Sequence, residues 1–115
     1  MKLRLVLAFA AVAVFGLAAT VHAQDKALID KGIKLYEEQK CSMCHSIAGK
    51  GQVKGPLDGV GTKLTADDIR TWLIDPKGMT AKTKAARVPA MKAYPNLPKA
   101  DVDAIVAYMV SLKKK

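Results

Sequence analysis

The segment Cys41-Ser42-Met43-Cys44-His45 constrains this chain of 115 residues more than any other feature. It holds both cysteines of the sequence, separated by two residues, and a histidine follows the second cysteine directly. A stretch with helical spacing ends just before the segment, so two thiols and one imidazole come from a single short turn. The ligand that these three side chains bind must lie against that turn, and the rest of the chain must wrap around it.

Cys-x-x-Cys-His is the attachment signature of a c-type haem. At the end of a helix, the thiols of Cys41 and Cys44 can reach the two vinyl groups on one side of a porphyrin. The imidazole of His45 then faces the iron, so that one segment supplies two thioether bonds and one axial ligand. We therefore predict one covalently attached haem c, held by Cys41, Cys44 and His45.

Three other uses of the two cysteines are weaker. A thioredoxin-like redox pair expects a βαβ context and a motif that starts a helix, whereas this motif follows one. A zinc site expects four cysteine or histidine ligands, and after residue 24 the sequence offers only three. A plain structural disulfide needs neither His45 nor the long glycine-rich stretch behind it. A non-haem thiol–disulfide protein is thus the most distant alternative.

The N-terminus has the pattern of a secretory signal peptide. Lys2 and Arg4 precede an apolar run without a charge over residues 5–20. Small residues then flank His22, at the two positions that a signal peptidase recognises. We predict cleavage after Ala23, a periplasmic location, and one domain over residues 24–115 that does not insert stably into a membrane. An uncleaved anchor is the alternative, because a membrane span needs about 20 apolar residues.

Three stretches with helical patterns predict an all-α domain. The first covers about residues 25–39, the second begins at the cap Thr65 and stops at Pro76, and the third runs from about Pro98 to the end. Residues 45–64 and 77–97 show loop chemistry and little periodicity. Loops of this length are uncommon in a compact domain, and wrapping a flat cofactor accounts for them. The predicted fold is three main helices with loops around a covalently attached haem.

The haem iron of an electron carrier needs a second axial ligand, and methionine opposite histidine raises the reduction potential. Met43 lies inside the attachment motif and cannot reach the far face, and Met109 lies on the apolar stripe of the last helix. Met79 and Met91 both lie in the second irregular segment. Because two prolines frame Met91 and stiffen its loop, we predict Met91 as the ligand, with Met79 as the alternative.

Nearly all of the chain after the signal peptide resembles the class I monohaem c-type cytochromes of the bacterial periplasm. The likeness is carried by Tyr36 to His45, Gly55-Pro56-Leu57, Trp72 with Asp75-Pro76, and Met91 to Leu112. Members of that family often have Met-Pro-Ala before the last helix. Either Val88-Pro89-Ala90 is this triplet with its methionine replaced, or Met91-Lys92-Ala93 is the triplet with its proline replaced. We prefer the second alignment, because the distance from Met91 to Tyr108 suits the family.

The resemblance implies further contacts. The first and last helices cross, and a close approach at Gly32 lets Tyr36 meet Tyr108. The carbonyl oxygen of Pro56 accepts the Nδ1 proton of the histidine ligand and so fixes its tautomer. Trp72 packs near the haem propionates. Pro56 and Trp72 are therefore expected among the cofactor-binding residues.

The charge is unevenly placed along a basic chain, which has 19 Lys and Arg against 10 Asp and Glu. No acidic residue lies between Glu38 and Asp58 or between Asp75 and Asp101, the two segments expected to surround the haem. Nine cations lie there: Lys40, Lys50, Lys54, Lys77, Lys82, Lys84, Arg87, Lys92 and Lys99. This pattern predicts a basic ring that docks redox proteins through their acidic surfaces.

The predicted function is that of a soluble periplasmic carrier of single electrons with His45 and Met91 as axial ligands. We expect a monomer rather than an enzyme, because the sequence shows no nucleophile paired with a base. Nucleic acid is not an expected partner, since arginines and aromatic residues are few. Two alternatives stay open: a cytochrome subunit of a larger periplasmic oxidoreductase, and a ligand-binding haem protein with an open or weakly held sixth position.

Overall fold

The computed structural model describes residues 25–114, so the predicted signal peptide at residues 1–23 lies outside the described part of the chain. A helix over residues 25–38 is followed by the 3₁₀ turn η1. The other elements, in chain order, are η1 (Cys41–Met43), β1 (Ser46–Ile47), β2 (Lys50–Gly51), α2 (Val60–Lys63), α3 (Ala66–Ile74), α4 (Pro76–Thr83) and α5 (Lys99–Ser111). The predicted all-α fold is confirmed, and the only strands among these residues form a two-stranded antiparallel sheet.

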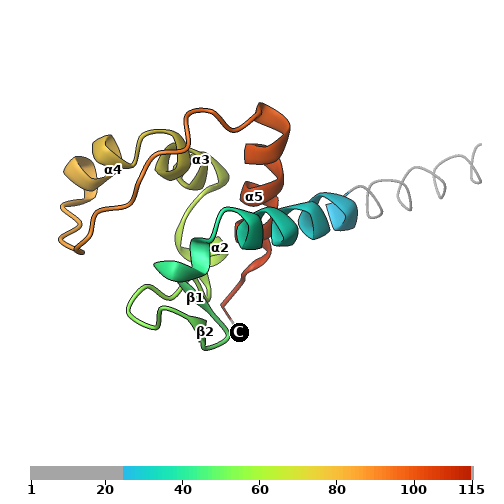
Figure 1. Cartoon of the computed structure of the whole chain (residues 1–115), viewed down its shortest axis with the longest axis horizontal. Helices are drawn as coiled ribbons and strands as arrows, with labels where there is room; N and C mark the ends of the chain where they lie inside the picture. Colours follow the sequence, from blue (N-terminus) through green and yellow to red (C-terminus); the bar gives the residue numbers. More distant parts are fainter. Residues whose placement is uncertain (1–24, 115) are drawn as a thin grey trace, which may run out of the picture.

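The helix over residues 25–38 lies across α5, which brings together the first and last helices of the described chain (Figure 1). Gly32 makes this approach possible: a Cβ there would collide with the carbonyl oxygen of Ala104 and lie 2.8 Å from Cβ of Tyr108. One turn further on, the rings of Tyr36 and Tyr108 meet edge to face, with centroids 5.8 Å apart and planes at 86°. The predicted contact of Gly32 and Tyr36 with Tyr108 is therefore confirmed.

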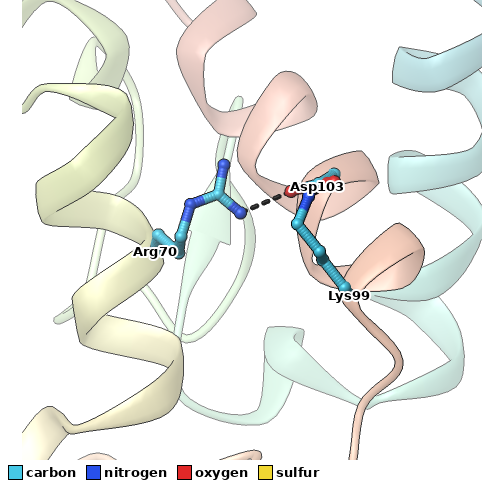
Figure 2. A network of polar contacts seen from close by, with 3 residues as sticks. All are labelled: Arg70, Lys99 and Asp103. Atoms are coloured by element: carbon cyan, nitrogen blue, oxygen red, sulfur yellow. Dashed lines mark hydrogen bonds and ion pairs between the residues drawn. The ribbon is translucent and has the colours of Figure 1, made fainter.

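The hydrophobic core lies where α3 and the helix over residues 25–38 pack against α5. Its buried side chains are Leu35, Tyr36, Ile69, Leu73, Val102, Ala104, Ile105, Val106 and Met109. An ion-pair network also joins α3 to α5. Asp103 of α5 accepts hydrogen bonds from Arg70 of α3 and from Lys99 (Figure 2). Nζ of Lys99 lies 2.9 Å from Oδ2 of Asp103. These two partners hold the pKa of Asp103 below its ordinary value, Lys99 contributing most.

Side-chain caps mark the starts of both α3 and α4. Thr65 and Asp68 form a reciprocal capping box at the start of α3, as the sequence predicts. The helix ends before Pro76, but Pro76 also starts α4, where Asp75 accepts a hydrogen bond of 3.0 Å from the backbone N–H of Gly78. The sequence predicts a loop with little periodicity over residues 77–97, so α4 is a difference from the prediction.

The end of α5 is tied to the short helix α2, which lies in a segment where the sequence predicts a loop. The N–H of Gly61 donates to the carbonyl of Leu112 at 2.9 Å, and Nζ of Lys113 donates to the carbonyl of Gly61 at 2.8 Å. A Cβ at Gly61 would strike the carbonyl of Val110. The glycine therefore permits contact between two backbones. Within residues 25–114, no helix has the length and apolar character of a membrane span.

Candidate functional site

The two cysteines lie on a tight turn that follows the helix over residues 25–38. Lys40 leaves the helix in the left-handed conformation, with φ of 55°, and η1 begins at the next residue. The N–H of His45 donates to the carbonyl of Cys41 at 2.9 Å, which closes the turn. Cys41 is half-buried, Cys44 is exposed, and their sulfurs are not joined to each other. The turn thus presents two separate thiols and one imidazole from a single segment, as predicted.

His45 is fixed by a backbone carbonyl. Its Nδ1 lies 3.0 Å from the carbonyl oxygen of Gly55, not from that of Pro56, so the predicted partner is wrong by one residue. The register explains the difference: Ser46 pairs with Pro56, the N–H of Ser46 donates to the Gly55 carbonyl, and the N–H of Leu57 donates back to Ser46. Successive carbonyls of an extended chain point in opposite directions. Only the carbonyl of Gly55 therefore faces the motif.

This hydrogen bond leaves Nε2 of His45 as the nitrogen available to a metal. Burial lowers the pKa of His45, the bond to Gly55 opposes that shift, and the positive charge of Arg87 adds to it. Both effects that lower the pKa favour the neutral imidazole, which is the form that ligates metals. Burial also raises the pKa of the Cys41 thiol.

The glycine-rich segment behind the motif is an ordered hairpin. β1 and β2 pair through Ser46 with Gly51 and Ile47 with Lys50. Gly51 has φ of 104°, and a Cβ there would collide with the carbonyl of His45. The next N–H, that of Gln52, lies 3.0 Å from the carbonyls of both Ser42 and His45. Glycine is therefore needed for the hairpin to fold back onto the turn that carries the thiols.

The segment that precedes α5 is anchored to the core close to the site. Met91, Tyr94 and Leu97 are half-buried and pack against the core, as does Cys41. The N–H of Tyr94 donates to the carbonyl of Leu73 at 2.8 Å, which anchors this segment to α3. Burial, and then the charges of the two cysteines, raise the pKa of Tyr94. The second irregular segment therefore returns to the attachment motif, although almost fifty residues separate the two.

The four methionines of the described chain have distinct environments. Met109 is buried in the core, as predicted, and Met43 is 72% exposed. Met79 is 5% exposed on α4 and is not a member of the core cluster. Met91 is half-buried and packs against the core, as Cys41 also does. Of the two methionines that the sequence leaves open as ligands, Met91 is thus partly accessible, whereas Met79 is covered.

A cavity of about 530 Å³ opens on another part of the surface, between α3 and the start of α5. Arg70, Ile74, Tyr94 and Lys99 are among its lining residues, and neither cysteine nor His45 takes part. It touches the candidate site only through the segment around Tyr94. Across residues 25–114, moreover, no three His, Cys, Asp or Glu side chains gather in a group that could hold a metal ion.

Comparison with known proteins agrees with this architecture. Residues 29–113 match the family model described as cytochrome c, so the chain belongs to the cytochrome c family. It is also 30% identical over 107 residues to the cytochrome c oxidase subunit 2 of Alkalihalophilus pseudofirmus (strain ATCC BAA-2126 / JCM 17055 / OF4), a match covering 85% of this chain and 30% of the relative. The chain thus spans less than a third of that protein's length. No solved structure matches it significantly.

The side chains at this site fit the haem c that the family implies. Two thiols that are not bonded to each other stand beside an imidazole with one nitrogen held and the other free. Half-buried apolar side chains, Ile47, Leu57 and Met91 among them, lie in the segments that follow the motif and can contribute the apolar lining that a porphyrin needs. A bound haem supplies an iron that gains and loses one electron. The place of Trp72, half-buried on α3, beside the propionates stays a prediction.

Proposed function

We propose that the protein is a soluble, monomeric, periplasmic carrier of single electrons, with one covalent haem ligated by His45 and Met91. Cleavage after Ala23 would release it from the membrane during export. The observation that carries the proposal is the arrangement at the motif, where Nδ1 of His45 is bound to the carbonyl of Gly55 and the same turn presents two thiols that are not joined to each other. Membership of the cytochrome c family supports electron transfer as the activity.

The surroundings of Met91 support it as the second ligand. Its neighbour Tyr94 is fixed to the backbone of Leu73, and Met91 and Cys41 both pack, half-buried, against the core. Met79 is 5% exposed on α4, so its side chain would have to be uncovered before it could bind an iron. A ligand on a loop held at a fixed point is better positioned than one that needs such a rearrangement.

Absorption spectra of the oxidised and reduced protein, together with its mass, test the haem and the cleavage site. Met91→Ala should abolish the sulfur-to-iron charge-transfer band and lower the reduction potential. The matched control is Met79→Ala, which should keep the band and lose stability by about 2 to 5 kcal/mol through the cavity it leaves. A band that survives Met91→Ala and disappears in Met79→Ala would reverse the assignment.

The charge distribution supports docking to acidic partners. The five ion pairs found within residues 25–114 all lie on the helix over residues 25–38, α3 and α5. Of the nine cations in the two acid-free segments, Lys99 alone joins one of these pairs. The other eight lie in the segments that also carry the thiols and Met91. Their charge is available to a partner, which would speed encounter at low ionic strength.

Electron-transfer rates to an acidic redox protein at increasing ionic strength test this surface. The double variant Lys40→Gln with Lys54→Gln should slow the reaction several-fold at low salt and have little effect at high salt. Lys26→Gln with Lys34→Gln removes the same charge from lysines that pair with Asp30 and Glu38 on their own helix. Equal slowing by both pairs would contradict a localised docking surface.

Membership of a larger oxidoreductase is the second candidate function, and one observation favours it: the relative is named as a subunit of cytochrome c oxidase. Purification from the native membrane and periplasm separates the two. A carrier elutes alone at the size of a monomer, whereas a subunit stays with other chains. Carbon monoxide binding to the reduced protein at neutral pH would instead indicate a ligand-binding haem protein with a weak sixth ligand.

A further inference from the structure

Arg87 connects the two halves of the candidate site. It lies four residues before Met91, and its Nη2 donates a hydrogen bond to the backbone carbonyl of Cys44. The rest of the guanidinium covers Gly55, where an added Cβ would overlap Nη1. Gly55 is the residue whose carbonyl holds His45. The side chain therefore runs from the loop that carries Met91 to the backbone beneath the attachment motif.

The loop between α4 and Tyr94 has little else to hold it. Every residue from 81 to 93 is exposed except Met91, so burial of apolar surface fixes little of this stretch. Within residues 25–114, the last hydrogen bond before this stretch joins the N–H of Ala85 to Thr80 at the end of α4. The first one after it joins the N–H of Tyr94 to Leu73. Between them, Arg87 makes the one hydrogen bond that reaches another part of the fold.

We propose that Arg87 is a positioning residue that holds the Met91 loop against the attachment motif and thereby sets how readily the loop opens. This inference rests on the proposed role of Met91 as a ligand. A hydrogen bond from a charged donor is stronger than one between neutral groups. Its loss would move the nearest anchor back to the end of α4, and the longer free loop would have more open conformations to occupy.

Binding of imidazole to the oxidised holoprotein measures loop opening, because imidazole competes with the methionine for the iron. Arg87→Gln should raise the affinity for imidazole about tenfold, which corresponds to about 1.4 kcal/mol. Arg87→Lys keeps a charged donor and should restore part of the difference. Lys84→Gln is the matched control, because it removes the same charge from an exposed side chain of the same loop.

A Met91→Ala background separates positioning of the loop from other effects of the substitution. Arg87→Gln should raise the affinity for imidazole when Met91 is present and leave it unchanged in Met91→Ala, where no methionine has to leave the iron. Equal imidazole affinities of Arg87→Gln and Lys84→Gln overturn the proposal, as does the same rise in the Met91→Ala background. Failure of the ligand assignment is distinguishable, because it appears as a charge-transfer band that survives Met91→Ala, whatever the Arg87 variants do.

Discussion

Replacing Gly32 by alanine tests whether the contact between the first and last helices of the domain is as close as the structure places it. The new Cβ would overlap the carbonyl oxygen of Ala104 and lie 2.9 Å from its carbonyl carbon. It would also lie 2.8 Å from Cβ of Tyr108. Carbon atoms in good contact are about 3.5 to 4.0 Å apart. Two of the three clashing atoms belong to the backbone of α5, so the helices must move apart.

The expected free energy combines three contributions. Overpacking in a close contact costs about 1 to 3 kcal/mol. Separating the helices also weakens the edge-to-face pair of Tyr36 and Tyr108, which is worth about 0.5 to 1.5 kcal/mol. Alanine returns about 1 kcal/mol, because it favours the helix more than glycine does. The net expectation is a loss of about 2 kcal/mol, or a decrease in Tm on the order of 10 °C for a domain of this size.

Denaturant unfolding of the holoprotein, followed by the fluorescence of Trp72, measures the change. Ala27→Gly on the exposed face of the same helix is the control, because it isolates the helix-propensity contribution and should cost about 1 kcal/mol. If Gly32→Ala increased stability by as much as Ala27→Gly decreases it, Gly32 would have open space in front of it. The close helix contact would then be refuted.

Three further predictions concern other parts of the domain. Thr65→Ala removes the capping box of α3 and should cost about 1 kcal/mol in denaturant unfolding, with an unchanged haem spectrum. Burial raises the pKa of Tyr36 from 10.0 to about 12, so the neutral phenol is favoured in the folded state. The neutral phenol of Tyr36 therefore stabilises the fold fully below pH 10, and this contribution is lost as the pH rises toward 12. Tyr36→Phe should remove this part of the alkaline loss of stability, as measured by unfolding at increasing pH. Met109→Ala leaves a cavity in the core and should cost about 2 to 5 kcal/mol, yet it should keep the sulfur-to-iron charge-transfer band.

The sequence predicted those parts of the fold that local chemistry determines. The last helix has a regular apolar stripe, and α3 has a cap and a proline stop, so both bounds came out close to the structure. α4 escaped prediction because its start depends on the cap Asp75 rather than on apolar periodicity. The same holds for α2, a single turn whose contacts are with the distant end of α5.

In the site, too, local residues could be predicted from the sequence, whereas long-range contacts could not. Cys41, Cys44 and His45 come from one turn, and their spacing alone assigned their chemistry. The carbonyl partner of His45 depends on the register between Ser46 and Pro56, which no local pattern encodes, and the prediction therefore missed Gly55 by one position. The sequence distinguishes Arg87 only as one of the cations in the two acid-free segments. Its bond to Cys44 bridges a long stretch of chain and becomes visible only when the loop is folded.

The crossing of the helix over residues 25–38 with α5 has a consequence for how the domain folds. The surface around Gly32 is covered by Ala104 and Tyr108, which lie more than seventy residues later in the sequence. Until this contact forms, the helix over residues 25–38 lacks the partner that buries Gly32. The turn that carries the two thiols directly follows this helix, so it takes its place in the domain only when α5 has packed against the helix.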